Sequence, residues 1–149
     1  MKAFYERFNR ERPKIQSVEK EFKLKIGDYW FFGRIDRIDD AGNGCVEIID
    51  YKTGEAKGQE LTAEDKRQLL LYQIAAEEPL ELKLKKLSYY YLEDDSFVSV
   101  NVEKADKEKL KTRFVENIEK IRKGEFDPSA SEFVCRYCEF NGICEFRKS

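Results

Sequence analysis

"CVEIIDYKTG", residues 45–54, is the stretch that decides the fold. Its β-branched, apolar run is typical of a buried strand, and the closing Thr-Gly marks the point where that strand ends. Side chains alternate between the two faces of a strand, so Asp50 and Lys52 point the same way and Tyr51 points the opposite way. An acid and a base therefore share one face at the end of a core strand. This pair is either a cross-strand salt bridge or part of a functional site.

The residues before this strand predict a helix, two strands and a loop. Polar and apolar side chains alternate over residues 17–26, and residues 29–38 are rich in aromatic and β-branched side chains. The loop that follows is made of turn-forming residues and predicts a hairpin. The predicted elements are a helix over 2–11, strands over 17–26 and 29–38, and a hairpin loop over 39–44.

The residues after the strand over 45–52 predict a helix, two strands and a second helix. Thr62 and Asp65 have the spacing of a capping box, which places a helix start just after Thr62. The predicted elements are a helix over 63–77, strands over 86–92 and 96–102, and a helix over 104–123. The tyrosines at 89–91 are expected to pack within their strand. This order indicates an α/β or α+β fold with a mixed central sheet of about five strands flanked by helices.

Length and composition limit the function classes. The 149 residues predict one domain over 1–149, with a cysteine-containing tail over 125–149 inside it. No apolar run is long enough to cross a membrane and the N-terminus has no apolar signal-peptide core, which predicts a cytoplasmic protein without a membrane partner. The net charge of −2 argues against a general nucleic-acid coat protein. Because histidine is absent, acid–base or metal chemistry must use other side chains.

A second acid lies near Asp50 in the predicted hairpin. Counting outward from the turn places Asp36 opposite Ile49, with an uncertainty of about one residue. A shift of one residue, from a bulge or an odd loop, sets Asp36 directly beside Asp50. Two opposed carboxylates repel each other unless a cation lies between them, and Mg²⁺ and Mn²⁺ favour oxygen ligands.

Other polar side chains could complete such a site. Glu19 and Glu21 lie on the polar face of the neighbouring predicted strand, and either could add a metal ligand. Gln68 and Tyr72 are four residues apart on the predicted helix, so they share a face and could contact the substrate backbone or hold the attacking water. Lys52 beside a metal could orient or deprotonate a water, or stabilise charge on a phosphate.

Three of the four cysteines form a C-x2-C-x5-C pattern in the tail. These are Cys135, Cys138 and Cys144, and the spacing favours metal or cluster ligation over disulfides in a cytosolic protein. Three thiolates plus another ligand could bind zinc, or the tail could hold nothing. Cys45 is expected to be a small buried strand residue, although the tail could reach it as a fourth ligand.

At these residues the sequence resembles the PD-(D/E)XK nuclease superfamily. It is most similar to the RecB-like branch, which includes the C-terminal nuclease domains of RecB and AddB and the CRISPR-associated adaptation nucleases. The matching segments occur in the family's order. They are "GRIDRID" (33–39), "IIDYKTG" (48–54), "QLLLY" (68–72) and "CRYCEFNGIC" (135–144).

The resemblance implies a restriction-endonuclease-like core and Mg²⁺- or Mn²⁺-dependent hydrolysis of DNA phosphodiesters. It implies that Asp36 and Asp50 are metal ligands, with the Tyr51 carbonyl as a possible third, and that Lys52 is the catalytic lysine. Residues 68–72 would be the family's QxxxY element, in which both polar residues act in catalysis. The implied context is a helicase–nuclease or a DNA repair and recombination system.

The chain departs from this family pattern in three ways. It lacks the histidine that the branch often carries before the first strand, it is short at the N-terminus, and it has no cysteine upstream of the core. The iron–sulfur members use one upstream cysteine and three at the end, so a [4Fe–4S] cluster would need a ligand from a further segment. We therefore expect a C-terminal piece of a longer domain, or a reduced homologue. One alternative is a non-catalytic nucleic-acid or protein-binding module with this fold. Another is an interaction domain whose tail is stabilised by a bound metal.

Overall fold

The structure, a computed structural model, describes residues 2–56, 61–101 and 107–148. Two compact units make up the chain, residues 1–115 and residues 116–149, and each is described by itself. The first unit holds the sheet and two helices, as well as the first half of a third helix that ends in the second unit. Within the described residues no helix is long and apolar enough to cross a membrane.

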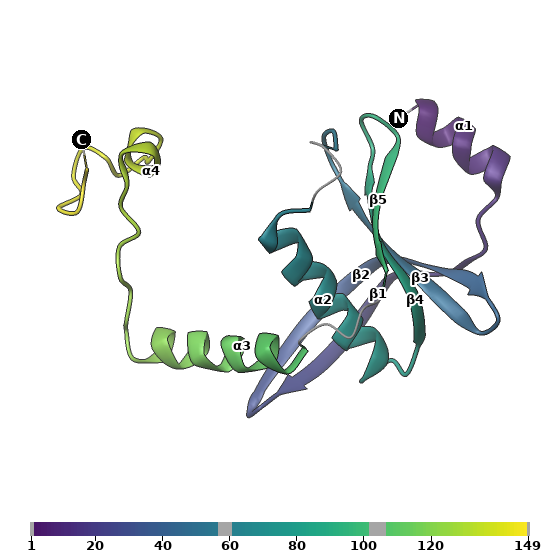
Figure 1. The fold of residues 1–149 in the computed structure, drawn as a ribbon, viewed down its shortest axis with the longest axis horizontal. Coiled ribbons are helices and arrows are strands. Elements are labelled where there is room, and N and C mark those ends of the chain that lie inside the picture. Colours follow the sequence, from purple (N-terminus) through teal and green to yellow (C-terminus); the bar gives the residue numbers. More distant parts are fainter. Residues whose placement is uncertain (1, 57–60, 102–106, 149) are drawn as a thin grey trace. The chain divides into compact units, whose positions relative to one another are not determined.

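The first unit is built around a mixed five-stranded sheet in the order β1-β2-β3-β4-β5 (Figure 1). Strands β3 and β4 pair in parallel, and every other neighbouring pair is antiparallel. Helix α2 forms the crossover that a parallel pair requires. The elements are α1 (Lys2–Glu11), β1 (Ile15–Ile26), β2 (Tyr29–Gly42), β3 (Cys45–Lys52), α2 (Ala63–Glu77), β4 (Lys83–Tyr91), β5 (Ser96–Asn101), α3 (Lys107–Arg122) and α4 (Glu132–Arg136). The predicted α/β fold with a mixed sheet and flanking helices is confirmed.

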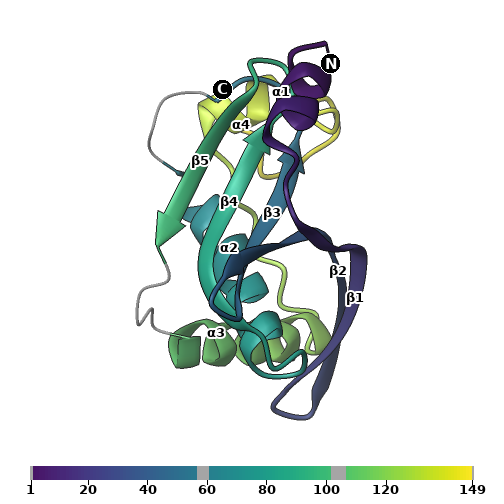
Figure 2. The ribbon, with the colours of Figure 1, turned by 90° about the vertical axis from the view of Figure 1, so that its right-hand side faces the viewer.

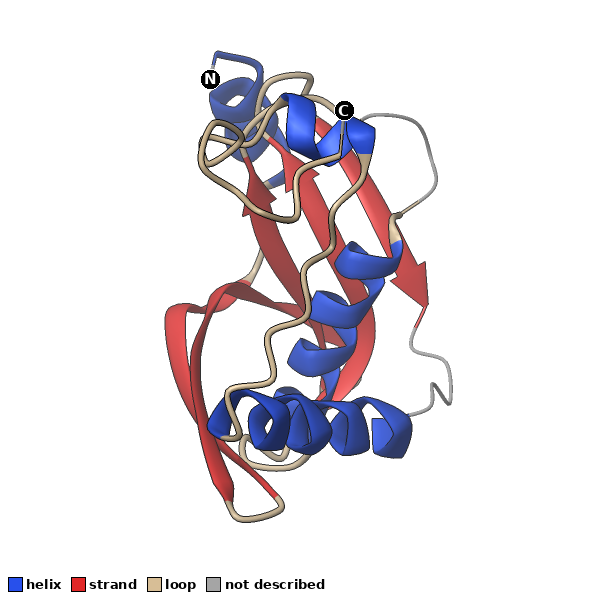
Figure 3. Cartoon of the chain, turned by 90° about the vertical axis from the view of Figure 1, so that its left-hand side faces the viewer, coloured by secondary structure: helices blue, strands red, loops and turns tan. Residues whose placement is uncertain are grey.

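Helices α1 and α2 lie on opposite faces of the sheet (Figures 2 and 3). The main core lies between α2 and the sheet, where Ile48, Leu69 and Ile74 are almost fully buried. On the other face, Phe4 of α1 packs its ring against the rings of Tyr51 and Tyr90. The face of β3 that carries Asp50 and Lys52 is therefore the α2 face.

The start of α2 is fixed by local hydrogen bonds, as the sequence predicts. The backbone N–H of Asp65 donates to Oγ1 of Thr62 at 3.1 Å, and the N–H of Thr62 donates to a carboxylate oxygen of Asp65 at 3.0 Å. This reciprocal capping box satisfies two donors that the first helical turn would leave unpaired. It holds the first turn of α2 in place beside the end of β3.

The predicted hairpin loop over 39–44 is too long. Strand β2 continues to Gly42, and only Asn43 and Gly44 form the turn, both with positive φ angles that suit a tight hairpin. The pairing shifts between Asp40 and Gly42, so Ala41 is an extra residue on β2. This bulge changes the register of the whole β2–β3 pair.

Two predicted boundaries fall outside the described residues. The last residue of the predicted strand over 96–102 and the first three of the predicted helix over 104–123 lie there. The described part of that helix, α3, begins at Lys107. In the second unit, Ser131 caps the short helix α4 by accepting a hydrogen bond from the Val134 N–H at 3.2 Å.

Candidate active site

The bulge in β2 brings the two predicted carboxylates together. Arg37 pairs with Ile49, so the next position along the ladder places Asp36 opposite Asp50. This is the register shifted by one residue that the sequence left open. The Asp36 carboxylate accepts a hydrogen bond of 2.8 Å from the backbone N–H of Tyr51, which ties it to the end of β3.

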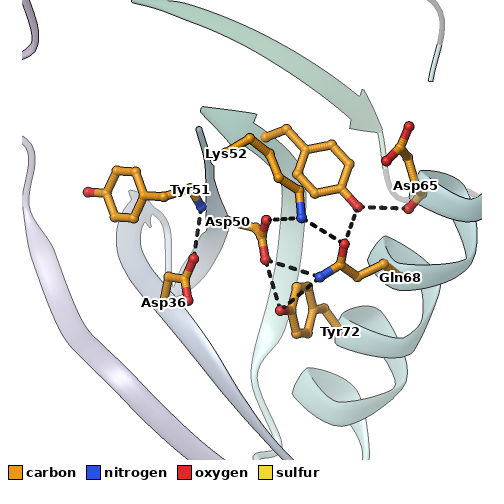
Figure 4. Close-up of polar contacts among 8 residues, drawn as sticks. Asp36, Asp50, Tyr51, Lys52, Asp65, Gln68 and Tyr72 are labelled. Atoms are coloured by element: carbon orange, nitrogen blue, oxygen red, sulfur yellow. Dashed lines mark hydrogen bonds and ion pairs between the residues drawn. The ribbon is translucent and has the colours of Figure 1, made fainter. Parts of the chain in front are cut away.

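A hydrogen-bond network joins β3 to α2 (Figure 4). Lys52 Nζ lies 2.8 Å from Oδ2 of Asp50 and donates to Oε1 of Gln68 at 2.9 Å. The Gln68 side-chain NH₂ donates to Oδ1 of Asp50 and to the Tyr72 hydroxyl oxygen, both at 3.3 Å. The Tyr72 hydroxyl donates to Oδ1 of Asp50 at 2.9 Å. The structure therefore brings the predicted β3 and α2 residues into one cluster.

The charge balance of this cluster favours a bound cation. Asp50 is 4% exposed, and its buried Oδ2 lies 2.8 Å from the Lys52 ammonium group. The pKa of Asp36 is raised, chiefly by burial and also by the charge of Asp50, while the hydrogen bond from Tyr51 opposes this rise. Two partly desolvated carboxylates beside one ammonium group leave a negative charge uncompensated, and carboxylate oxygens are ligands that Mg²⁺ and Mn²⁺ prefer.

The tyrosine in this cluster is a hydrogen-bond donor. Burial, the charge of Asp50 and the bond to Asp50 all raise the pKa of Tyr72 well above its ordinary value. The phenol therefore stays protonated at neutral pH and can orient the Asp50 carboxylate, but it cannot accept a proton there.

Replacing Asp36 by Asn should stabilise the metal-free protein at neutral pH. The raised pKa means that the folded state binds a proton more tightly than the unfolded state, so the ionised Asp36 costs stability above its folded pKa. As the pH falls, that cost disappears, and below the ordinary pKa of 3.8 the variant should lose its advantage. Asparagine can still accept the Tyr51 hydrogen bond. Urea unfolding in EDTA from pH 7 to pH 3.5 measures this difference, and a gain independent of pH would contradict it.

A residue that the sequence did not assign to the site is Tyr89. It pairs with Asp50 across the parallel β3–β4 ladder, and its hydroxyl lies 2.9 Å from Oε1 of Gln68 and 3.0 Å from the Asp65 carbonyl. Its ring also lies under Lys52, with Nζ 4.6 Å from the ring centre. No local pattern could identify Tyr89, because its role depends on the parallel pairing of two distant strands.

The two predicted glutamates are held by an arginine. Arg34 bonds to Glu19 at 2.9 Å and to Glu21 at 3.3 Å, and both glutamate side chains are largely exposed. Glu19 is close enough for its charge to raise the pKa of Asp36. Glu21 pairs with Arg34 in the β1–β2 ladder. It therefore lies two residues farther along β1 from Asp36 than Glu19 does.

The backbone of Tyr51 lies at the candidate site, whereas its side chain points to the other face of the sheet. Its hydroxyl lies on the α1 face and accepts a hydrogen bond from Arg37 at 3.1 Å. Its N–H already bonds to Asp36 at the end of β3. The alternation along β3 thus separates Tyr51 from Lys52, as the sequence predicts.

The cysteine tail does not form a metal site in the described residues. Cys135 is buried and its sulfur accepts a hydrogen bond from the Lys148 N–H at 3.4 Å, whereas Cys138 and Cys144 are half-buried. All three are free thiols, and within residues 2–56, 61–101 and 107–148 no group of three His, Cys, Asp or Glu side chains is close enough to hold a metal. Zinc or an iron–sulfur cluster does not fit this arrangement, so the structure gives no support to either.

Comparison with known proteins identifies the fold family. The model of the PD-(D/E)XK nuclease superfamily matches residues 1–145. The chain belongs to this superfamily. The match covers the sheet, α2 and the site described above, together with most of the cysteine tail.

Similar individual proteins agree with the superfamily fold. The chain is 24% identical over 140 residues to the Gene 69 protein of Mycobacterium phage L5, covering 90% of the chain and 46% of the phage protein. The crystal structure of SSO0001 has a TM-score of 0.53 and 22% identity, covering 89% of this chain and 62% of that one. The crystal structure of a Eubacterium rectale protein, described as an exonuclease candidate, has a TM-score of 0.58 and 13% identity. This match covers 99% of this chain and 62% of that one. The chain thus spans about half to three fifths of the length of these three proteins.

Proposed function

We propose that this domain is a Mg²⁺- or Mn²⁺-dependent deoxyribonuclease of the RecB-like branch of its superfamily. The observation that carries this proposal is that the Asp36 carboxylate reaches the end of β3, where it accepts a hydrogen bond from the Tyr51 N–H beside the Asp50–Lys52 ion pair. Residues 1–149 would act as one nuclease domain with the tail over 125–149. A DNA substrate, a cytoplasmic location and a helicase–nuclease or repair and recombination partner belong to the same proposal.

Asp36 and Asp50 would hold the divalent metal, with the Tyr51 carbonyl as a further ligand. Glu19 is the acid best placed to assist, because its charge already acts on Asp36. When bound, the metal would supply positive charge for the phosphate in the transition state. The repulsion between the two carboxylates supports this assignment.

The residues of β3 and α2 would carry the rest of the reaction. Lys52 would stabilise the negative charge that grows on the phosphate oxygens as water attacks phosphorus and the bridging P–O bond breaks. An ammonium group has three donors, and the contacts with Asp50 and Gln68 engage two of them, which leaves one for a phosphate oxygen. Gln68 and Tyr72 would keep Lys52 and Asp50 in this orientation. The attacking water would lose a proton to solvent, and the leaving oxygen would take one from solvent.

The test is a cleavage assay on labelled single-stranded and duplex DNA with Mg²⁺, Mn²⁺ or EDTA. We expect cutting with either metal and none in EDTA. A folded protein that never cuts DNA, but binds it with a steep dependence on salt, would instead be the non-catalytic binding module.

Tyr89→Phe should slow cleavage by about fivefold, which is the cost expected for one misplaced hydrogen bond of roughly 1 kcal/mol. The variant keeps the ring beneath Lys52 but loses the hydroxyl that fixes the Gln68 carboxamide. We expect kcat to fall with KM little changed, since Tyr89 acts through Gln68 and not on the substrate.

Tyr90→Phe is the matched control for this prediction. The Tyr90 hydroxyl donates to Asp95, and its ring packs on the α1 face of the sheet. Loss of that hydroxyl should reduce stability to a similar degree and leave kcat unchanged. Equal losses of kcat in the two variants would show that Tyr89 has only a structural role.

A further inference from the structure

Two large aromatic side chains project from β2 without being buried. Trp30 is 52% exposed and Phe32 is 72% exposed. They are two residues apart, so they share one face of the strand, about 6.6 Å apart at roughly 3.3 Å per residue. That spacing is about twice the 3.4 Å rise between stacked bases of one DNA strand. Neighbouring exposed aromatics of this size usually mark a binding surface.

Positive charge accompanies these rings. Lys23 Nζ lies 4.2 Å from the centre of the Trp30 ring and 5.4 Å from that of Phe32, and Lys25 Nζ lies 5.9 Å from the Trp30 ring. Residues 20–34 hold four Lys or Arg against two Asp or Glu, whereas the whole chain has a net charge of −2. We call Lys23, Lys25, Trp30 and Phe32 the aromatic platform. Rings interleaved with ammonium groups are complementary to a strand of bases and phosphates.

The aromatic platform lies on the strand that also carries Asp36, on the face of β2 opposite to Gly33 and the buried Phe22 ring. A hollow of about 610 Å³ lies next to Phe32, lined by Phe32 itself and by Glu21, Phe22, Gly33 and Arg34. Arg34 bonds to Glu19, whose charge reaches Asp36. From Trp30 to Asp36 the strand covers six residues, or about 20 Å. A stacked strand of about six nucleotides has the same length.

We infer that the aromatic platform binds the single-stranded DNA that enters the active site. This inference rests on the proposed nuclease function and names the form of its substrate. Bases of a single strand have open faces that can stack on Trp30 and Phe32, whereas base faces in a duplex are already covered. Stacking is stronger than a cation–π contact at an exposed site, so an incoming base displaces the ammonium groups, which then pair with phosphates.

The test is DNA binding in EDTA, where cleavage cannot contribute. Trp30 is the single tryptophan of the chain, so its fluorescence reports directly on the aromatic platform. We expect an unlabelled single strand of twenty nucleotides to quench this fluorescence, and a hairpin duplex of equal length to do so much less. By fluorescence anisotropy of a labelled strand, Trp30→Ala and Phe32→Ala should each weaken binding by about tenfold.

Tyr5→Ala is the matched control, because Tyr5 is an exposed aromatic (68%) on α1. It should change the affinity less than twofold. Phe32→Ala keeps Trp30 as the reporter, so its folding and its affinity can be read from the same signal. Unchanged affinity in both platform variants, or no quenching by single-stranded DNA, would overturn the inference, and a protein partner would then be the better occupant. If single-stranded DNA quenches the fluorescence but the wild type does not cleave DNA, the aromatic platform binds DNA and the proposed nuclease activity is rejected. If the wild type cleaves DNA without quenching, the nuclease activity stands and the DNA-binding role of the aromatic platform is rejected.

Discussion

Lys52→Met should slow DNA cleavage by about a thousandfold. The ammonium group lies within 3 Å of both Asp50 and Gln68, at the end of the strand where the phosphate would bind. Removing one group that stabilises transition-state charge costs about 10²–10³ in rate, and loss of proton transfer can cost more. Methionine keeps an unbranched apolar stem over the Tyr89 ring, so the fold should persist. The measurement is single-turnover cleavage of labelled DNA with saturating Mg²⁺.

Lys86→Met is the matched control for this variant. Lys86 also forms an ion pair, with Glu47 at 3.0 Å, but Glu47 lies on the other face of β3 from Asp50. The Lys86→Met variant should keep nearly all cleavage activity. Comparable losses in the two variants, or activity that survives Lys52→Met, would remove Lys52 from the catalytic role.

Asp50→Asn should abolish both cleavage and the stabilisation that Mg²⁺ or Mn²⁺ gives the folded protein. The carboxylate is buried, and its Oδ2 already lies 2.8 Å from one cation, the Lys52 ammonium group. A metal that binds only the folded state at 10 to 100 times its Kd stabilises it by about 1.4–2.7 kcal/mol. For a chain of this size that corresponds to a Tm shift of roughly 3–10 °C. Thermal unfolding of wild type and variant, with and without metal, measures this shift independently of activity.

Glu47→Gln is the matched control, since Glu47 is the other acid of β3 and pairs with Lys86. It should keep both the metal-induced shift and cleavage. If the shift persists in Asp50→Asn, the metal binds elsewhere. If it is absent from the wild type, the assignment of Asp36 and Asp50 as metal ligands fails.

The sequence predicts most of the fold correctly because its signals are local. Alternation along 17–26 and the β-branched run of 45–52 each indicate a strand, and the Thr62 capping box fixes the start of α2. These patterns depend on backbone geometry and on near neighbours, so they survive in any tertiary context. The placement of Asp50 and Lys52 on one face of β3 follows from the same alternation.

The long-range features of the site could not be predicted in this way. The sequence could narrow the partner of Asp36 only to within one residue, because the register depends on whether the hairpin contains a bulge. It left Glu19 and Glu21 as equal candidates for the metal, whereas the structure pairs both with Arg34 and places Glu19 close enough for its charge to raise the pKa of Asp36. The cysteine spacing predicted a metal centre that the described residues do not form.

The sequence by itself therefore determined which elements form and which side chains share a face, since these follow from periodicities of about two and 3.6 residues. Only the tertiary structure decided which of those faces meet. The bulge at Ala41 sets Asp36 beside Asp50, and the parallel pairing of β3 with β4 brings Tyr89 to Gln68. Both outcomes depend on the packing of the whole sheet against α2, because the free energy that selects one register over another is spread over many distant contacts.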